Sequence, residues 1–469
     1  MNEPDLSLAQ LLGPSGPGIC RALRAAREFL CGRDVPELLR QVGRTIAEVP
    51  AANHLDKRYF QASCRCSPVD RPDDLLTGQG TFYITEQRRL FLDCTAGHYQ
   101  MTWGYHHPQL TAAVRAAMDA GIVWDDHSNI PGNAVKRLAE RLVDAVHGGA
   151  ADPDLLGDDA GLNTVLLGIC TGSVAASSAL KLALLHHEQQ RPGRAPVLIS
   201  LQGNYHGTDF LAQRMRGMWP AYFTDITCVE VEPNDVAGLR AAFESHQGHV
   251  AAMFAEPVMM NREAIGLDAE FLRTARQLCD AADACLVLDE IQTGFWCPEA
   301  FMFRQYGLEP DIVVLGKGMT AGLHPLSAIV YRRKYDRLAQ YDAISTNGNA
   351  PLAAVAGLGC LELIATQRSR IEQLSRQYFE RLWTLAAAHP DRVAGIHGRG
   401  LLTGIKFRTV EDALEFHRRA VERGLWVRVH AYHAGHSTIL TKFALAADER
   451  IADFLVDTFH EILQELGHA

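Results

Sequence analysis

Two neighbouring stretches of the sequence decide the fold class of this chain. Residues 286–295 read LVLDEIQTGF, and residues 310–319 read PDIVVLGKGM. In each stretch an apolar run, suited to a buried strand, ends in polar groups, which are the carboxylate of Asp289 and the amine of Lys317. Open α/β sheets place their ligand chemistry at the carboxyl ends of the strands. The two stretches therefore predict an α/β sheet with a functional site at that edge.

A carboxylate and a lysine at two strand ends are the protein groups that a pyridoxal 5'-phosphate (PLP) site needs. The carboxylate can pair with the pyridine nitrogen, and the lysine can form a Schiff base. A lysine between two glycines is by itself usually a solvated loop residue. Lys317, however, follows the apolar run 312–316 and lies 28 positions after Asp289. Together the two residues favour the PLP interpretation.

The motif of these two stretches resembles that of the class III aminotransferases, a PLP-dependent family of fold type I. In that family an apolar strand leads into Asp-Glu-(Val/Ile)-Gln-Thr-Gly-Phe, and a spacer then leads to Pro-Asp-Ile-Val and a Lys-Gly pair. The resemblance extends from about residue 80 to the C-terminus. It implies a fold-type I architecture, with a large domain built on a mainly parallel mixed sheet flanked by helices and a smaller α/β domain.

The order of predicted strands and helices along the chain agrees with an alternating α/β domain. Apolar runs predict strands at 164–168, 197–201, 250–255, 285–289, 312–316 and 327–331, and helical periodicity predicts helices at 173–189, 234–246 and 268–282. This alternation indicates a mainly parallel sheet that helices cover on both faces.

We expect four segments along the chain. Residues 1–60 are an N-terminal extension with helices near 18–30 and 35–48. Residues 61–130, which include a hairpin at 81–93, form the N-terminal part of the small domain and a linker. Residues 131–350 form the large PLP-binding domain. Residues 351–469 form the C-terminal small domain, with helices at 351–365, 368–388, 411–423 and 448–465 and strands at 401–407 and 425–429.

Gly172 and Ser173 stand where a strand ends and a helix begins. The free N–H groups and the dipole of a helix N-terminus attract phosphate, and glycine lets the backbone come close to it. A serine at this place is also a common helix cap without any ligand. The resemblance implies that both residues hold the cofactor phosphate.

Further contacts to the cofactor follow from the resemblance. It places the ring of Tyr205 over the pyridine ring, with His206 beside it, although a loop aromatic of this kind can also simply cover the core. Glu256 matches a Glu-Pro pair near the substrate, and Gln292 is expected to bond the 3'-oxygen. Thr346 matches a threonine that reaches the phosphate of the neighbouring subunit. The resemblance therefore implies a homodimer with shared active sites.

The resemblance implies amino transfer between an amine or amino acid and a carbonyl acceptor. Lys317, Asp289 and Tyr205 are the expected catalytic residues, with Lys317 also moving the proton of the substrate carbon. The same residues would serve decarboxylation, epimerisation or β/γ-elimination and substitution, so that these reactions remain an alternative. A catalytically silent binding subunit is a third reading, which the retained Lys317 and Asp289 disfavour.

The substrate side departs from the family pattern. Family members that act on α-amino acids carry an arginine that grips the carboxylate, and the matching position holds Thr441, followed by Lys442. A lysine does not reproduce the planar fork of an arginine. The sequence therefore leaves open whether the substrate carries an α-carboxylate. Residues expected to form the pocket wall are His98, Tyr99, Gln100, Trp103 and Trp296.

Composition excludes several other classes of protein. The net charge of −10 and the lack of a Lys/Arg block argue against nucleic acid or an anionic membrane as partner. The first residues resemble neither a secretory signal nor an anchor, and eleven scattered cysteines indicate reduced thiols, so we expect a cytoplasmic protein. We expect no metal, because Cys64 and Cys66 lack a second pair, and because His430, His433 and His436 suggest a pocket rim or surface loop.

Overall fold

A computed structural model describes residues 7–61, 73–125, 130–151, 161–217, 226–339, 342–343 and 348–466. Its centre is a seven-stranded sheet in the order β4-β12-β11-β10-β7-β5-β6. These strands are β4 Leu162–Ile169, β5 Val197–Leu201, β6 Thr227–Val231, β7 Val250–Ala255, β10 Cys285–Asp289, β11 Ile312–Leu315 and β12 Ser327–Arg332. All run parallel except β12, which is antiparallel to both of its neighbours. The predicted α/β class with a mainly parallel mixed sheet is confirmed.

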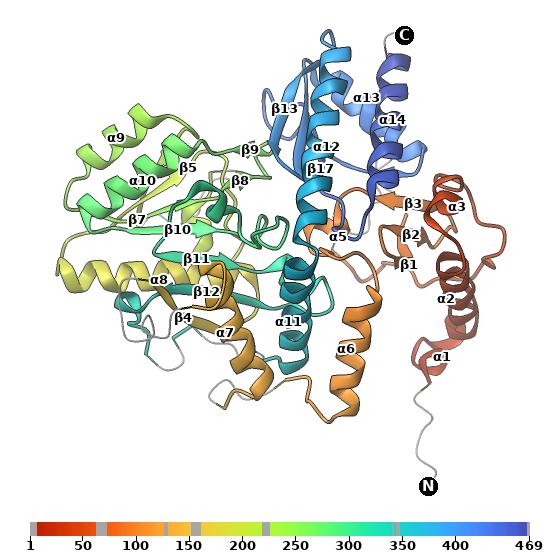
Figure 1. The fold of residues 1–469 in the computed structure, drawn as a ribbon, viewed down its shortest axis with the longest axis horizontal. Coiled ribbons are helices and arrows are strands. Elements are labelled where there is room, and N and C mark those ends of the chain that lie inside the picture. Colours follow the sequence, from red (N-terminus) through yellow and green to blue (C-terminus); the bar gives the residue numbers. More distant parts are fainter. Residues whose placement is uncertain are drawn as a thin grey trace.

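Helices cover both faces of the sheet (Figure 1). Along β10, Val287 packs in the core under α8 Gly172–Gln190, whereas Leu286 and Leu288 pack in the core on the other face, where α10 Ala269–Ala282 lies. Successive side chains of a strand point to opposite faces, so a strand buried on both sides is apolar at every position. This explains why the uninterrupted run that precedes Asp289 marked a central strand.

A second, smaller unit contains the C-terminal part of the chain. Its antiparallel sheet has the order β13-β14-β17-β16. The strands are β13 Val393–Arg399, β14 Leu402–Phe407, β16 Arg428–His430 and β17 Thr438–Thr441, and the helices are α12 Arg368–Ala388, α13 Val410–Glu422 and α14 Glu449–Leu466. Helix α11 Pro351–Thr366 leads into this unit from the large sheet and packs against α6 Pro108–Asp119 and α7 Asn133–His147 (Figure 1).

Strands from the N-terminal and C-terminal parts of the chain pair in a small mixed sheet. Strands β1 Leu75–Gln79, β2 Phe82–Thr85 and β3 Leu90–Asp93 form antiparallel pairs, and β15 Leu425–Trp426 adds to β3 in parallel. The hairpin predicted at 81–93 is therefore present. The strand predicted at 425–429 is divided between β15 and β16 Arg428–His430, and the pairing of β15 with β3 was not predicted, because periodicity does not identify the partner of a strand.

The N-terminal helices differ in part from the prediction. Helix α2 Gly16–Cys31 is present, whereas the helix predicted at 35–48 ends at Leu39, as α3 Val35–Leu39. Beyond it the backbone pairs with the hairpin, since Gly43 N donates to Leu90 O and Leu90 N donates to Arg44 O. Gly43 has a φ of +82°, a conformation that an α-helix does not contain. Tertiary hydrogen bonds with β3 thus override the helical pattern.

Strands β6, β13 and β17 were not predicted, and β6 is a partly exposed edge strand whose alternation is weak. Cys64 and Cys66 lie outside the described residues, and the nine cysteines within them are free thiols. No helix in the described part of the chain is long and apolar enough to cross a membrane.

Candidate active site

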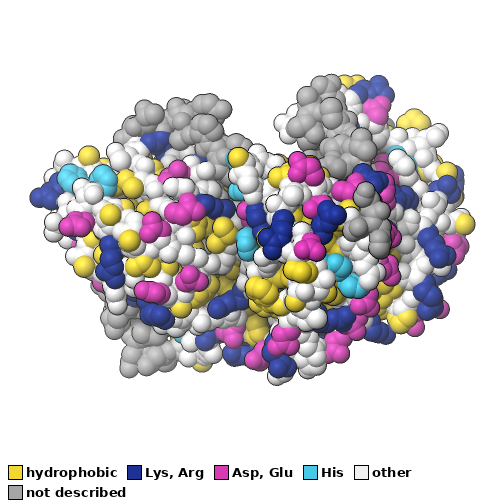
Figure 2. Space-filling model, turned by 90° about the horizontal axis from the view of Figure 1, so that it is seen from above, with side chains coloured by type: hydrophobic (Ala, Val, Ile, Leu, Met, Phe, Trp, Pro, Cys, Tyr) yellow, Lys and Arg dark blue, Asp and Glu magenta, His cyan; other side chains and the backbone are white. Residues whose placement is uncertain are grey.

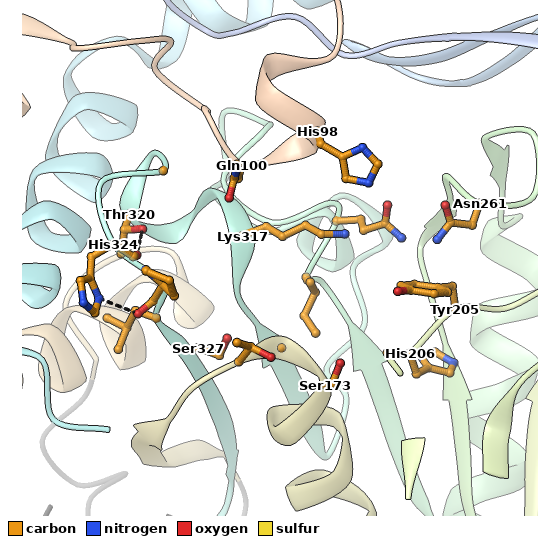
Figure 3. Close-up of a pocket in the computed structure, with 18 of the residues that line it drawn as sticks. His98, Gln100, Ser173, Tyr205, His206, Asn261, Lys317, Thr320, His324 and Ser327 are labelled. Atoms are coloured by element: carbon orange, nitrogen blue, oxygen red, sulfur yellow. Dashed lines mark hydrogen bonds between the residues drawn. The ribbon is translucent and has the colours of Figure 1, made fainter. Parts of the chain in front are cut away.

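The predicted site residues come together at one edge of the large sheet. The carboxyl ends of β4, β5, β7, β10 and β11 meet there because these strands run parallel. A cavity of about 510 Å³ opens at this edge. Of the residues predicted to hold the cofactor, those that line it are Gly172, Ser173, Tyr205, His206, Gln292 and Lys317 (Figure 3). Asp289 and Glu256 lie behind this lining and hydrogen-bond to it.

Asp289 and His206 form a buried pair. The Asp289 Oδ2 lies 2.8 Å from His206 Nδ1, and Oδ1 accepts from Ile291 N at 2.9 Å. Burial lowers the pKa of His206, but the hydrogen bond to Asp289 and its charge outweigh this, so that the pKa is raised above its usual value. The pair is thus electrostatically coupled, with a carboxylate held in a fixed orientation. Because Asp289 is on the same face of β10 as Val287, it lies on the α8 side of the sheet.

Glu256 connects two other predicted residues. Its Oε1 accepts from the backbone N–H of Tyr205 at 2.9 Å, and its Oε2 accepts from Gln292 Nε2 at 3.4 Å. Burial raises the pKa of Glu256 to about 7. The carboxyl group therefore positions the aromatic loop and the glutamine rather than facing the cavity itself.

Lys317 is the first residue of a short 3₁₀ turn, η5 Lys317–Thr320, directly after β11. Its φ is +39°, in the left-handed region, and Thr102 Oγ1 donates to the next carbonyl, Gly318 O, at 2.8 Å. Such backbone strain is typical of functional sites. Burial lowers the pKa of Lys317 to about 8, and the charge of Arg428 adds a smaller lowering. The negative charges of Asp289 and Glu256 raise this pKa, but they do not outweigh burial. Within the described residues no carboxylate forms an ion pair with this amine, so it is available for chemistry in the cavity.

The amino end of α8 closes the cavity opposite the lysine. Ser173 Oγ accepts from Thr208 N at 3.1 Å, and the N–H groups of the first helical turn have no partner inside the helix. A Cβ at Gly172 would lie 2.9 Å from Ile291 Cδ1, and Gly207 has a φ of +120°. The glycines thus keep the helix end close to both neighbouring loops. Thr346, the predicted third phosphate contact, lies outside the described residues.

The substrate side is built differently from the family pattern. Thr441 is buried away from the cavity, 2.7 Å from Tyr378 Oη and 2.5 Å from Thr403 Oγ1. Lys442 is also fully buried; its Nζ donates to Gln292 O and lies 4.2 Å from the centre of the Trp296 ring. Burial, together with the charge of Lys317, lowers the pKa of Lys442 well below its usual value. Neither residue can reach a substrate in the cavity.

The expected wall residues divide into two groups. His98 and Gln100 line the cavity, and Figure 3 shows the His98 ring across the cavity from Tyr205, with the end of Lys317 between them. Tyr99, Trp103 and Trp296 are instead fully buried behind the lining. The expectation that these three form the wall is therefore wrong, because none of them lines the cavity.

Several lining residues were not singled out from the sequence, namely Asn261, Thr320, His324, Ser327 and Arg428. For Arg428 a signal existed, because a charged residue stands between the buried Val427 and Val429. The placement of His430 in a rim or surface loop was wrong, since it lies in β16 and is fully buried. In the part of the chain that the structure describes, no group of three or more ligand side chains could hold a metal ion.

The residues present fit the cofactor that the resemblance implies. The cavity volume lies in the range of cofactor sites, roughly 300–1,000 Å³. It offers a helix end for phosphate, a buried carboxylate for the ring nitrogen and an unpaired amine. Two buried polar atoms of its lining, His206 Nε2 and Gln292 Oε1, have no hydrogen-bond partner in the structure. Buried polar groups are normally satisfied, so such atoms mark the place of a ligand.

Comparisons with known proteins agree with this arrangement. An acetylornithine aminotransferase from Caldanaerobacter subterraneus subsp. tengcongensis is 26% identical over 88% of this chain and 98% of its own length. A glutamate-1-semialdehyde 2,1-aminomutase from Nitrosomonas europaea is 28% identical over 80% of this chain and 88% of its own. Among solved structures, an aminotransferase from Bacillus anthracis superposes with a TM-score of 0.75 at 20% identity, covering 87% of this chain and 96% of the other.

The family comparison covers most of the chain. The profile described as "Aminotransferase class-III" matches residues 72–463, a range that includes every residue described above as lining or supporting the cavity. The protein is therefore an enzyme of the class III aminotransferase family.

Proposed function

We propose that the protein uses PLP, bound through Lys317, to transfer an amino group between an amine or amino acid and a carbonyl acceptor. The observation that carries this proposal is the Lys317 amine, which has no ion pair among the described residues and faces a cavity between the Asp289–His206 pair and the amino end of α8. When bound, the cofactor would supply an electron-withdrawing ring that stabilises negative charge on the substrate carbon.

Asp289 and His206 would control the ring nitrogen. The carboxylate of Asp289 is buried and oriented from two sides, by His206 Nδ1 and Ile291 N. An opposite charge at close range favours protonation of a basic nitrogen, and low exposure to water strengthens that effect. We assign Gln292 to the oxygen on the ring, since Glu256 uses only one of the two Nε2 hydrogens and the other can donate to that oxygen.

Lys317 would move the proton of the substrate carbon. A general base works best when its pKa is close to the working pH, and the pKa of this amine is lowered to about 8. The left-handed backbone at Lys317 and the hydrogen bond from Thr102 to Gly318 hold the start of the side chain in place. Tyr205, whose backbone is bonded to Glu256, would pack on the ring face.

Gly172 and Ser173 would hold the phosphate at the amino end of α8. Thr346 would add a contact from the second subunit of a homodimer with shared sites. Exposed apolar side chains near the cavity support such a contact: the ring centre of Trp124 lies 6.2 Å from that of the lining residue His324, and the preceding Val123 is exposed. Mixing the inactive variants Lys317→Ala and Thr346→Ala should restore part of the activity after subunit exchange, and no recovery would count against shared sites.

A second reaction class is favoured by one specific observation, the similarity to an aminomutase. Such an enzyme, like a decarboxylase or an elimination enzyme, would use the same cofactor residues but would not need a separate carbonyl acceptor. The cavity residues next to the cofactor serve both classes equally.

A single-turnover experiment separates these classes. Holoenzyme at known site concentration is mixed with a panel of amines and amino acids without any acceptor, and the carbonyl product is quantified. Amino transfer should stop at one equivalent of ketone or aldehyde per site, and a second turnover should require a keto acid or aldehyde. Continuous product formation without an acceptor, or release of CO₂, would refute amino transfer as the net reaction.

A further inference from the structure

We propose that a second cavity, apart from the one that holds Lys317, binds a small phosphate monoester with an apolar body. This cavity has a volume of about 540 Å³ and is lined by residues of α7, of the end of α11 and of the loop 298–300. Helices α7 and α11 lie side by side (Figure 1). No described residue lines both cavities, so the proposal concerns a different site and rests on no part of the proposed function.

Arginine side chains dominate the charge of this cavity. Four arginines from three elements line it, together with two acidic residues: Arg137 and Arg141 of α7, Arg304 of the 3₁₀ turn η4 Met302–Tyr306, Arg368 of α12, and the acids Asp144 and Glu299. In the whole chain, by contrast, 45 Lys and Arg stand against 55 Asp and Glu. Over the face shown in Figure 2, basic side chains are mixed with acidic ones. The excess of arginine is therefore local, and it favours an anionic ligand.

Arg304 has no acidic partner. It is partly buried, and its Nη1 donates to the backbone carbonyl of Glu299 at 3.4 Å. The Glu299 carboxylate pairs instead with Arg368 at 3.3 Å, and no carboxylate of the described residues forms an ion pair with Arg304. A guanidinium has five N–H donors in a planar fork. Most of this fork is therefore left for a ligand.

The end of α7 keeps Arg304 at the cavity. Gly148 caps this helix with a φ of +87°, and a Cβ at this position would collide with the guanidinium of Arg304. Glycine thus serves both the left-handed turn and the close approach of the arginine. The nearby Asp144 orders the chain that follows the helix, because its Oδ1 accepts from Ala151 N at 3.0 Å.

Exposed ion pairs hold two of the other arginines. Arg141 Nη2 lies 3.7 Å from Glu362 Oε2, and Arg137 Nη1 lies 2.8 Å from Glu140 Oε2. Both glutamate side chains are well exposed, at 66% and 63%. Such pairs contribute about 0–1 kcal/mol, so a doubly charged ligand can displace the glutamates. Because Arg137 and Arg141 are one helical turn apart, they repel each other, and an anion between them relieves this repulsion.

The arrangement of the donors favours phosphate over carboxylate. A carboxylate offers two oxygens in one plane, which suit one guanidinium fork, whereas a phosphate monoester offers three acceptor oxygens and a charge of about −1.5 to −2. Guanidinium groups from three different elements match the second geometry. The buried lining residues Ala300, Leu361 and Ile364 are apolar and form the floor. An apolar body attached to the phosphate gains free energy by covering them.

Binding of phenyl phosphate to the protein saturated with PLP tests the proposal. Dissociation constants are measured by calorimetry. Arg304→Gln should weaken the binding about 10-fold to 100-fold, the range expected for hydrogen bonds to a charged group. Arg304→Lys should recover only part of the loss, because it keeps the charge without the fork. Glu362→Gln should tighten the binding, since it removes the anion that competes for Arg141. A purely structural role would not give opposite effects in these variants.

Two matched controls change residues outside the cavity. Arg418 is exposed on α13 and pairs with Glu415 and Glu422, so Arg418→Gln should leave the dissociation constant unchanged. Ser173→Ala should not change it either, which distinguishes this cavity from the phosphate position at the amino end of α8. Each variant is checked by its thermal unfolding midpoint. Because Glu362 is exposed, Glu362→Gln tests the proposal even if Arg304→Gln is unstable.

Carboxylates with the same ring test the chemical class of the ligand. Benzoate and isophthalate, with one and two carboxylates, should both bind more weakly than phenyl phosphate. Tighter binding of isophthalate that depends on Arg304 would overturn the assignment to a phosphate monoester. The site itself would be refuted if phenyl phosphate did not bind, if Ser173→Ala abolished its binding, or if Arg304→Gln and Glu362→Gln both left the dissociation constant unchanged.

Discussion

The two sides of the active site are built on different structural elements. The cofactor side, made of Ser173, His206, Asp289 and Lys317, stands on strand ends and a helix end of the large sheet. The substrate side, made of His98 and Arg428 with Thr441 and Lys442 buried behind them, stands on a strained turn and on the short strands β16 and β17. The first side matches the motif by which the chain resembles its family, whereas the second departs from that motif at Thr441. We therefore expect the common chemistry on the large sheet and the selectivity on the elements that depart from the motif.

The largest expected effect concerns the lysine of the cofactor side. Lys317→Ala should lower kcat/KM by at least about 10⁴-fold, because the variant loses both the covalent attachment and the general base. Lys442, the buried lysine of the substrate side, is the matched control, since its amine bonds Gln292 O and does not face the cavity. Borohydride reduction of the holoenzyme followed by peptide mass spectrometry should find the cofactor on Lys317. Finding the reduced cofactor on Lys442 instead would mean that Lys442, and not Lys317, forms the Schiff base.

The next effect concerns the buried carboxylate. Asp289→Asn removes a charge that is bonded to His206, and loss of a buried charge pair costs about 2–5 kcal/mol. We therefore expect kcat to fall about 30-fold to 1,000-fold or more, at about 1.4 kcal/mol per tenfold. The pKa of His206 should also fall, since Asp289 is what raises it. Measuring the His206 titration by NMR checks the cause, and an unchanged titration with reduced kcat would assign the loss to another origin.

The third effect concerns Thr441→Arg, which would place the arginine of the family pattern on the substrate side. Thr441→Arg should not create a carboxylate site, because Thr441 is buried against Tyr378 and Thr403. An unpaired buried charge should instead lower the free energy of unfolding by about 3–5 kcal/mol, measured by denaturant titration. Thr441→Val, which loses only hydrogen bonds, should cost about 1–3 kcal/mol. A stable Thr441→Arg variant with tighter dicarboxylate binding would contradict the geometry.

The smallest effect is a dependence on pH that couples the two sides. Only the neutral Lys317 amine can react, and its pKa is lowered to about 8. The rate of reconstitution of the apoenzyme with PLP should therefore rise about tenfold per pH unit below 8 and level off above it. Arg428→Gln should move this midpoint to higher pH, because the charge of Arg428 helps to lower the pKa. An unchanged midpoint would mean that the two residues are not electrostatically coupled.

The sequence by itself determined the fold class and which residues, those proposed to hold the cofactor, gather at one edge of the sheet. Both can be recognised from short stretches of sequence. A strand that is buried on both faces is a continuous apolar run, and a polar group at the end of that run, such as Asp289 or Lys317, lies at the carboxyl edge of the sheet. Strands β5, β7 and β10 have the predicted bounds for the same reason.

Only the tertiary structure decided the substrate side. Arg428 and His98 are 330 positions apart and meet because β15 pairs with β3, which places the strands of the small sheet beside the turn at Ala96–Tyr99. The periodicity of the strand predicted at 425–429 does not reveal its partner β3, and the left-handed turn depends on the buried carboxylate of Asp93. The helix predicted at 35–48 ends at Leu39, because hydrogen bonds with β3 replace it beyond that residue. Long-range pairing, rather than local preference, decides which side chains face the substrate.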